Sequence, residues 1–402
     1  MNKPIFFYFF APSFHFFLLS LRHKTPMIYE SMKILYVYEN IVTYGGVERI
    51  FVDKMNYLVN NYSADVFFLT YNQGSHQMSF KIDEKVRYAD LGIMFFRSYR
   101  YHGFRKYWDK YRRLVLFKNR LKEYLDELNP DIIITTTIGP VKYLLRYKGD
   151  ASLVIESHSG FDHIMEFQND SFRNRYKYRL QKNRIKKADC VVSLTERDAS
   201  LWRKFHHHVI VIPNFIHPYD AGRYSTLDNK QVIFVGRYSN QKAIPDLVDI
   251  WKMVNQRHPD WCLELYGKGL YEEYLKEIVN NNFNISCHPP TSDIFSHFIE
   301  SSLFVLTSYY EPFGLAVGEA MSCGLPVVAF EGDGPCSIIT DGHDGFIIKG
   351  RNKTAFADRV CQLIEDKEYR QKIGRNAISS VQRYSISHIM PLWKELFESF
   401  IK

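Results

Sequence analysis

Two glutamates, Glu311 and Glu319, stand eight positions apart in the segment YYEPFGLAVGEAMSCG, residues 309 to 324. The preceding FVLTS is typical of a strand, and YYEPF would form the loop at its carboxyl end. The next residues, GLAVGEAMSCG, predict a helix that ends at Gly324. Both carboxylates would then lie close to the start of a helix that follows a buried strand.

The amino terminus of this helix is a candidate binding site. A helix start exposes unpaired N–H groups and the positive end of the helix dipole. The amides of Phe313, Gly314 and Leu315 are therefore predicted to bind a phosphate or a sugar hydroxyl. Carboxylates beside them would accept hydrogen bonds from a polyol. The structural alternative is that Glu311 only begins the helix and that Glu319 lies on the surface.

The elements that position these residues belong to an α/β pattern. A chain of 402 residues exceeds what one hydrophobic core usually supports, so two domains are expected. Short apolar runs alternate with longer helical stretches, as in a parallel sheet covered on both faces. From residue 32 the runs are KILYVY, ADVFFLTY, PDIIITTT, SLVIES, DCVVSLT and VIVIPN.

A second domain is predicted after the connection that contains Pro213 and Pro218. Its strands are QVIFVGR, CLELYG, NISCH, LFVLTS, LPVVAF and GFIIK. We expect two doubly wound, Rossmann-like domains, 32–210 and 211–385, with a ligand cleft outside the carboxyl ends of both sheets. The tail, 386–402, has helical spacing and could simply cap the second domain.

The N-terminal segment 1–31 is apolar from Pro4 to about Leu21 and has three interpretations. It is an upstream extension from a misassigned start, because MKILYVY at residue 32 looks like the natural opening of an α/β domain. It is a membrane anchor, with Arg22 and Lys24 on the cytoplasmic side. It is a secretory signal, although no small-x-small cleavage site follows the apolar run.

The six cysteines contain no C-x-x-C pair, so neither a zinc knuckle nor a redox motif is indicated. We expect reduced, buried thiols, as in a cytoplasmic protein.

Basic charge is concentrated in two segments of the first domain. Residues 97–122 contain ten Lys or Arg against one acid, and residues 171–187 contain eight against none, whereas the whole chain has a net charge of +8. Aromatic residues interleave with the first segment. This composition suits an anionic membrane surface, and a solvated helical face or nucleic acid are the alternatives. Because no nucleic-acid motif accompanies the charge, we expect a peripheral protein at the inner face of the cell membrane and no nucleic-acid partner.

The segment EPFGLAVGEA resembles the paired-glutamate signature of the retaining glycosyltransferases of family 4, which have the two-domain GT-B fold. Further sequence motifs of that family occur in the family's order along residues 32–402. They are TYGGVERI, ESHSG, VIPNFI, FVGRYSNQKAIPDLV, LYGKG and GLPVVA. The resemblance implies that the tail helix crosses back onto the first domain.

The resemblance also implies roles for residues of the second domain. Arg237 and Lys242 would hold the diphosphate of a nucleotide-sugar, which offsets the charge that develops on the leaving group. Glu319 would accept hydrogen bonds from the ribose hydroxyls. Glu311, with the amides of residues 313–315, would hold the donor sugar.

In the first domain the resemblance implies that Gly45 and Gly46 let the backbone approach a phosphate or the acceptor. His158 would lie near the reacting sugar and polarise a hydroxyl. Glu48 and Arg49 are interpreted as helix-start residues.

The mechanism implied by the family retains the anomeric configuration and needs no protein nucleophile. We expect no metal, because Arg237 and Lys242 neutralise the diphosphate and the chain has no Asp-x-Asp pair. No cofactor is expected either, since the nucleotide-sugar is a substrate.

The predicted function is therefore a hexosyltransferase that moves a sugar, from a UDP-sugar, to a lipid-linked or polysaccharide acceptor in bacterial-type surface glycan assembly. Two other classes compete with it. One is a nucleotide-sugar epimerase of the same fold, and the other is a non-catalytic protein that binds a membrane surface.

Overall fold

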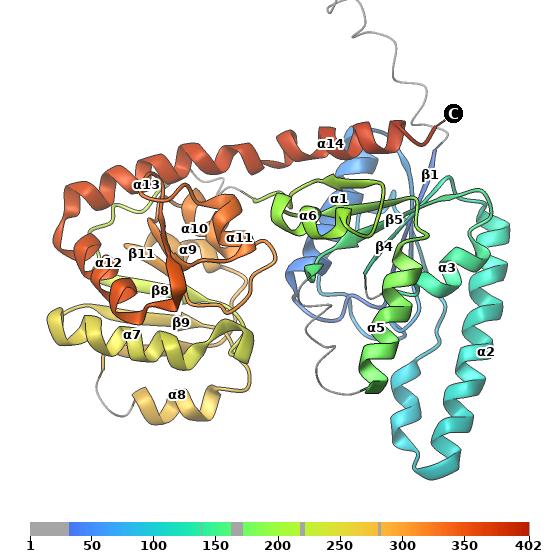
Figure 1. Cartoon of the computed structure of the whole chain (residues 1–402), viewed down its shortest axis with the longest axis horizontal. Coiled ribbons are helices and arrows are strands. Elements are labelled where there is room, and N and C mark those ends of the chain that lie inside the picture. The colour runs from blue at the N-terminus through green and yellow to red at the C-terminus, as the bar shows by residue number, and fades with distance from the viewer. Residues whose placement is uncertain (1–31, 138, 162–171, 218–221, 280–282, 402) are drawn as a thin grey trace, which may run out of the picture.

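Two parallel sheets, each flanked by helices, form the computed structural model of the chain (Figure 1). The structure describes residues 32–401 except 138, 162–171, 218–221 and 280–282. The apolar segment 1–31 and residue 171 of the second basic segment lie outside the described residues.

The first sheet has seven parallel strands in the order β3-β2-β1-β4-β5-β6-β7. They are β1 (Lys33–Tyr38), β2 (Asp65–Thr70), β3 (Arg87–Asp90), β4 (Ile132–Thr136), β5 (Ser152–Ser157), β6 (Cys190–Ser193) and β7 (Val209–Val211). The sequence predicted six of them and missed β3. That strand is a four-residue edge strand, RYAD, with no fully buried residue, so it lacks the apolar pattern of its neighbours.

The second sheet has six parallel strands in the order β10-β9-β8-β11-β12-β13, and the sequence predicted all of them. They are β8 (Gln231–Val235), β9 (Cys262–Tyr266), β10 (Ile285–His288), β11 (Leu303–Leu306), β12 (Val327–Phe330) and β13 (Phe346–Ile348). The predicted fold class, two doubly wound Rossmann-like domains, is confirmed.

Helices cover both sheets. In the first domain they are α1 (Gly46–Asn61), α2 (Gly103–Leu128), α3 (Val141–Tyr147), α5 (Phe172–Ile185) and α6 (Glu196–Arg203). In the second they are α7 (Ile244–Arg257), α8 (Glu272–Val279), α9 (Ile294–Ile299), α10 (Leu315–Ser322), α11 (Asp333–Ile338), α12 (Lys353–Glu365) and α13 (Lys367–Val381), and α14 (Ile386–Glu398) follows them.

Alternation along β1 shows how the first sheet is packed. Ile34 and Tyr36 belong to the apolar core that contains the buried face of α1. Leu35 and Val37 belong to the core that contains the buried residues of α2 and α3. Because successive side chains of a strand point to opposite faces, a strand buried on both sides must be apolar throughout, which is why KILYVY was recognisable.

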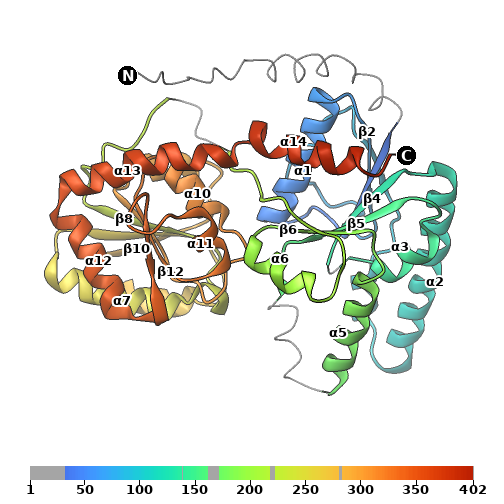
Figure 2. The ribbon, with the colours of Figure 1, turned by 45° about the horizontal axis from the view of Figure 1, so that its top comes forward.

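Helix α14 crosses from the second domain to the first and lies along α1 (Figures 1 and 2). The Trp393 ring is 3% exposed, and its centroid lies 4.0 Å from Nζ of Lys54 in α1. Phe400, just beyond α14, meets His208 with ring centroids 6.2 Å apart. The simpler expectation, that the tail only caps the second domain, is therefore wrong, and the crossing implied by the resemblance is confirmed.

All six cysteines are free thiols. Cys190, Cys323 and Cys361 are buried as expected, but Cys287 and Cys336 are exposed. Cys287 lies on the edge strand β10 and Cys336 on the short helix α11, where few elements cover a side chain. In the described part of the chain, no helix has both the length and the hydrophobicity needed to cross a bilayer.

The packing of α14 predicts a stability effect. Trp393→Ala is expected to lower the free energy of unfolding by about 3 kcal/mol, because it removes a large buried ring between the tail helix and α1. Leu392→Ala, on the same helix but 40% exposed, is the matched control and should cost less than about 1 kcal/mol. Urea unfolding followed by circular dichroism measures both, and equal losses would contradict this account of the tail.

Candidate active site

The loops after β8 and β11 meet because these two strands are neighbours in the second sheet. The Lys242 ammonium, at the end of the β8 loop, donates to the carboxylate of Glu311 in the β11 loop. Ser308 donates to the same carboxylate at 3.3 Å. The Lys242 and Glu311 side chains are 15% and 13% exposed, so opposite charges neutralise each other in a largely desolvated position.

The β11 loop is held in shape by Arg351. Its guanidinium donates to the carbonyl oxygens of Thr307 at 2.9 Å and Ser308 at 3.0 Å, and it pairs with Asp246 at 2.6 Å. It also lies 4.0 Å from the centroid of the Tyr309 ring. Glu311 therefore extends from a loop whose backbone is fixed before any ligand arrives.

Helix α10 begins at Leu315, four residues after Glu311, with Gly314 as its N-cap residue. Within the described residues, the backbone amides of Phe313, Gly314 and Leu315 donate no hydrogen bond. The Phe313 side chain is buried and meets Tyr384 edge to face, with centroids 5.5 Å apart. These three amides, at the positive end of the helix dipole, are the groups that the sequence predicted to bind a phosphate or a sugar hydroxyl.

Arg237 lies in the same loop as Lys242. Its side chain is exposed and makes no hydrogen bond or ion pair within the part of the chain that the structure describes. The Lys242 side chain packs over the preceding Gly236, where an added Cβ would lie 3.4 Å from the Lys242 Cε atom. The structure thus brings Arg237, Lys242 and Glu311 together at the carboxyl ends of the central strands β8 and β11.

Glu319, one turn into α10, is 8% exposed, so the interpretation of it as a surface residue is wrong. Its Oε1 atom accepts a hydrogen bond from Arg49 of the first domain at 2.7 Å. Arg49 therefore does more than begin α1, because it links the two domains. No partner of Glu319 Oε2 is found among the described residues.

The glycine-rich loop also reaches the second domain. A Cβ on Gly46 would lie 2.9 Å from the Leu315 Cδ1 atom, and one on Gly45 would lie 2.1 Å from the Glu48 carboxylate. Glu48 itself accepts a hydrogen bond from Tyr38 at 3.2 Å. The Leu315 and Glu48 atoms are the ends of flexible side chains, so these contacts do not by themselves require glycine, but the Leu315 contact shows that the loop lies against the start of α10.

His158 follows β5 and is 8% exposed. Its Nε2 atom lies 2.8 Å from the Glu156 carboxylate, which also binds Lys54 of α1 through both oxygens at 2.5 Å. The next carbonyl group along the chain, of Ser159, accepts a hydrogen bond from Tyr310 of the β11 loop. This contact places the His158 segment beside Glu311 across the domain boundary.

Burial and neighbouring charges have opposite effects on the pKa values of Glu156 and Lys54. Burial alone would raise the pKa of Glu156, but the Lys54 charge and the hydrogen bonds from His158 and Lys54 outweigh it and hold the pKa below its ordinary value. Burial lowers the pKa of Lys54, against the effect of the Glu156 carboxylate. The pair is best described as ionised, because a buried carboxylate requires a cation beside it.

The sequence analysis missed Lys54, Glu156, Tyr310 and the interdomain role of Arg49. A signal existed for the first two. Lys54 stands four residues after Ile50 on the buried face of α1, and Glu156 interrupts the apolar run SLVIES. Ionisable residues at core positions indicate a buried partner.

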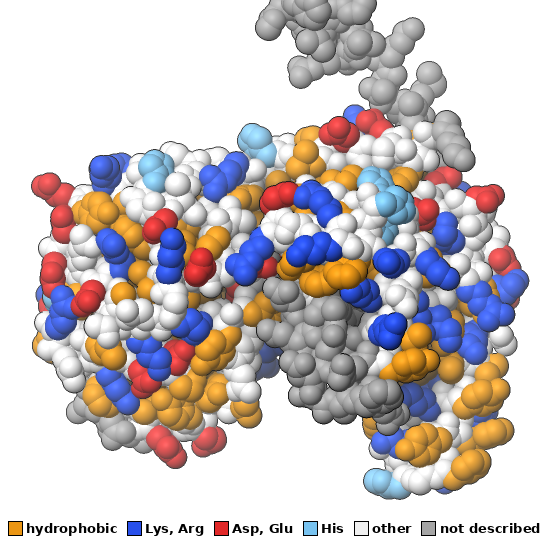
Figure 3. Space-filling view, viewed as in Figure 1, with side chains coloured by type: hydrophobic (Ala, Val, Ile, Leu, Met, Phe, Trp, Pro, Cys, Tyr) orange, Lys and Arg blue, Asp and Glu red, His pale blue; other side chains and the backbone are white. Residues whose placement is uncertain are grey.

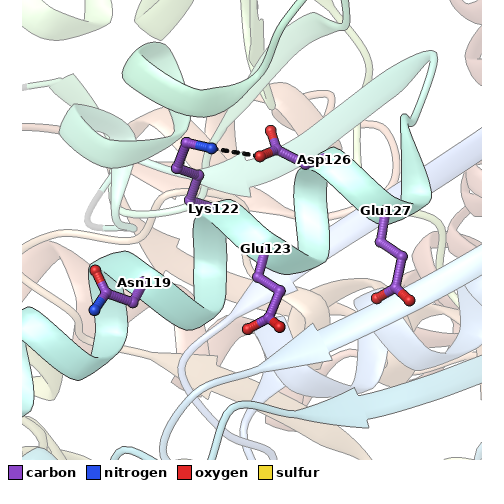
Figure 4. Close-up of a pocket in the computed structure, with 5 residues that line it drawn as sticks. All are labelled: Asn119, Lys122, Glu123, Asp126 and Glu127. Carbon is purple, nitrogen blue, oxygen red and sulfur yellow. Dashed lines mark hydrogen bonds and ion pairs between the residues drawn. The ribbon is translucent and has the colours of Figure 1, made fainter.

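One surface concavity lies away from these residues, on the outer side of α2 (Figure 4). All five of its lining residues come from that helix: Asn119, Lys122, Glu123, Asp126 and Glu127. Lys122 pairs with Asp126 at 2.5 Å, and both side chains are more than half exposed. Because a single helix lines it, this concavity is open to solvent and does not enclose a ligand. Within the described residues no group of three or more His, Cys, Asp or Glu side chains could hold a metal ion.

Comparison with known proteins identifies two family matches. Residues 44–219 match the sequence model of Glycosyltransferase Family 4, and residues 223–380 match that of Glycosyl transferases group 1. An uncharacterized glycosyltransferase of Haemophilus influenzae is 27% identical over 90% of this chain and 99% of its own length. The poly(glycerol-phosphate) alpha-glucosyltransferase of Bacillus subtilis is 23% identical over 86% of this chain, which spans 48% of that protein.

A solved structure gives the same fold. A mutant form of S. aureus TarM, in complex with fondaparinux, alpha-GlcNAc-glycerol and UDP, superposes with a TM-score of 0.73 at 15% identity, covering 91% of this chain and 99% of that one. With two Rossmann-like domains, a returning C-terminal helix and both family models matched in order, the chain belongs to the GT-B glycosyltransferases of group 1, family 4.

Proposed function

We propose that this enzyme is a retaining glycosyltransferase that moves a sugar from a UDP-sugar to a lipid-linked or polysaccharide acceptor in bacterial surface glycan assembly. The observation that supports it best is the convergence at the ends of β8 and β11. A cation pair, Arg237 and Lys242, lies there with the carboxylate of Glu311 and the free amides of α10. A nucleotide-sugar offers the matching phosphates and hydroxyls.

The comparisons support the donor and the acceptor class. The TarM complex contains UDP and a glycerol-linked sugar, and the B. subtilis relative is named for a poly(glycerol phosphate) acceptor. We therefore infer UDP as the nucleotide and a surface polymer or its lipid-linked precursor as the acceptor.

Donor binding would exchange partners within the site. A phosphate oxygen takes the place of the Glu311 carboxylate at Lys242, and the freed carboxylate accepts a hydrogen bond from a hydroxyl of the donor sugar. Glu319 can keep Arg49 on Oε1 and receive a ribose hydroxyl on Oε2. Each charged group thus retains a partner, which keeps the cost of desolvation low.

The transfer step breaks the bond between the anomeric carbon and the diphosphate oxygen, and the electron pair leaves with the diphosphate. The acceptor hydroxyl attacks the same face and forms the new glycosidic bond. Its proton passes to the departing phosphate oxygen. Arg237 and Lys242 stabilise the charge that develops there, so we expect no divalent ion to be required.

A donor screen tests this proposal. Full-length protein is incubated with UDP-, GDP- and ADP-sugars, with and without membrane extract and with a chelator, and nucleotide release is measured. We expect extract-dependent release from a UDP-sugar that survives the chelator. Release of no nucleotide would favour a binding protein, and conversion of the sugar without release would favour an epimerase.

Three substitutions should each slow transfer strongly in a protein that still folds. Glu311→Ala, Glu319→Ala and Lys242→Ala are each expected to lower kcat/KM by about 10²-fold, as loss of one charged group at a developing charge does. Lys230→Ala is the matched control, because its ion pair with Asp260 is exposed and remote from the site. The site assignment would be overturned by three variants that transfer as well as the control.

A close backbone contact gives an independent test of the β11 loop. A Cβ on Gly334 would lie 2.2 Å from the Phe313 carbonyl oxygen and 2.7 Å from that of Glu311, so Gly334→Ala must displace the loop. We expect UDP to bind about tenfold more weakly, a loss of about 1.4 kcal/mol by calorimetry. Gly332→Ala is the control, because its nearest neighbour would be at 3.7 Å and its φ of −173° is extended. Unchanged UDP affinity in Gly334→Ala would contradict the role of this loop.

The protein is further proposed to work at the inner face of the membrane, through basic segments 97–122 and 171–187. Exposed aromatic and basic side chains gather at the projecting end of the first domain, at lower right in Figure 3. The exposed fractions there are 81% for Phe104, 72% for Tyr107 and 53% for Trp108. Rings of this kind settle at the headgroup level of a bilayer, and the lysines and arginines attract anionic lipids.

Vesicle sedimentation tests this surface. The full chain should pellet with anionic but not neutral vesicles, and salt should release it because exposed charges are screened. Combining Phe104→Ser with Trp108→Ser should weaken binding about tenfold. Leu270→Ser, equally exposed but in the second domain, should not. Equal binding to both kinds of vesicle would remove the proposal.

A further inference from the structure

A buried ion pair lies behind His158. The ammonium group of Lys54 contacts both oxygens of the Glu156 carboxylate at 2.5 Å, and both side chains are 1% exposed. The same carboxylate lies 2.8 Å from Nε2 of His158. Three residues from α1 and from the end of β5 thus form one chain of hydrogen bonds that ends at the predicted site residue.

Aromatic rings enclose the ammonium group. The Lys54 Nζ atom lies 4.0 Å from the ring centroid of Trp393 in α14, 5.0 Å from that of Phe51 in α1 and 5.8 Å from that of Tyr36 in β1. Rings at these distances stabilise a desolvated cation. The tail helix therefore closes the group off from water and leaves Glu156 as its partner.

The hydrogen-bonding capacities decide where the imidazole proton lies. An ammonium group only donates hydrogen bonds and an ionised carboxylate only accepts them. Glu156 therefore requires a donor from His158, which puts the proton on Nε2. The Nδ1 atom is buried and has no hydrogen-bond partner among the described residues. In the neutral imidazole, Nδ1 then carries the lone pair.

We propose that Lys54 and Glu156 are positioning residues that hold His158 as the tautomer protonated on Nε2, so that Nδ1 accepts a hydrogen bond from a substrate hydroxyl. This inference rests on the proposed function, since only a polyol substrate would supply that hydroxyl. The Ser159 carbonyl, bonded to Tyr310 beside Glu311, brings this segment to the donor loop.

The other side chains that face Lys54 and Glu156 do not bring a further charge to the ion pair. Burial, and then the Glu156 carboxylate, raise the pKa of the Tyr36 hydroxyl, which stays neutral. Trp393 and Phe51 do not titrate. Lys54 is thus the cation that balances Glu156 when His158 is neutral.

Removing either charge should place a proton on Nδ1. In Lys54→Met the carboxylate loses its cation. It then either takes a proton and donates it to Nε2, or draws a second proton onto the imidazole. In Glu156→Gln the amide oxygen turns to Lys54 and the amide NH₂ donates to Nε2. In every case Nδ1 carries a proton and can no longer accept a hydrogen bond.

The experiment reads the tautomer directly. Full-length protein labelled with ¹⁵N-histidine is examined by two-bond ¹H–¹⁵N correlation, and the His158 signals are assigned by their loss in His158→Gln. In the wild-type protein we expect the Nε2–H tautomer. In Lys54→Met and Glu156→Gln we expect an Nδ1–H or doubly protonated ring. Leu121→Ala, which perturbs the buried face of α2 away from this group, is the control and should keep the wild-type signature.

Kinetics gives a second readout. Both variants should lose about 10²-fold in kcat/KM, while UDP affinity stays within about twofold, because the nucleotide contacts lie in the other domain. An Nδ1–H tautomer in the wild-type protein, or a wild-type signature in either variant, would overturn the proposal. The isosteric Glu156→Gln decides the matter if Lys54→Met does not fold. Because the tautomer is measured without transfer, a failed donor screen and a failed tautomer test are distinguishable.

Discussion

The adjacency of β8 and β11 is the constraint on which the site depends. The chain leaves β8 toward β9 on one side and returns to β11 on the other, so the loops after these two neighbouring strands lie side by side at the carboxyl end of the sheet. Lys242 and Glu311 are 69 positions apart in the sequence and become an ion pair there. The start of α10 follows at once, which adds its amides to the same place. A parallel sheet with this order therefore brings Lys242, Glu311 and the start of α10 together from the second domain alone.

The first domain is joined to that end of the sheet by packing and by charge. Buried residues of α1, the connection 212–216, α14 and the second sheet form one continuous apolar core. Arg49 of α1 pairs with Glu319 of α10, and Tyr310 donates to the backbone of the His158 segment. Because α1 supplies core residues, Arg49 and Lys54, a shift of this helix would disturb both Glu319 of the second domain and the Glu156–His158 group of the first.

The secondary structure could be predicted from the local sequence pattern much further than the partner of each charged side chain. Buried strands such as SLVIES are apolar on both faces and were recognised, whereas the edge strand Arg87–Asp90 has no such pattern. Glu311 and the amides after it were predicted because strand, loop and helix start are consecutive in sequence. The partner of Glu319 was not, since Arg49 is 270 positions away and only the packing of two domains brings them together. Lys54 and Glu156 broke the apolar pattern of their elements, which indicates burial but not the identity of the partner.

The paired charges also bear on selectivity. In the structure Lys242 pairs with Glu311, and Arg49 with Glu319, so these four side chains carry no net charge before a ligand binds. A simple anion that displaced Glu311 from Lys242 would leave a largely buried carboxylate without a partner, at a cost of about 1–3 kcal/mol. A ligand that brings a phosphate to Lys242 and a hydroxyl to Glu311 compensates both groups at once. If donor binding proceeds by the exchange of partners proposed above, selection for a molecule that combines a diphosphate with a polyol follows from that exchange, in addition to the charge of the cations.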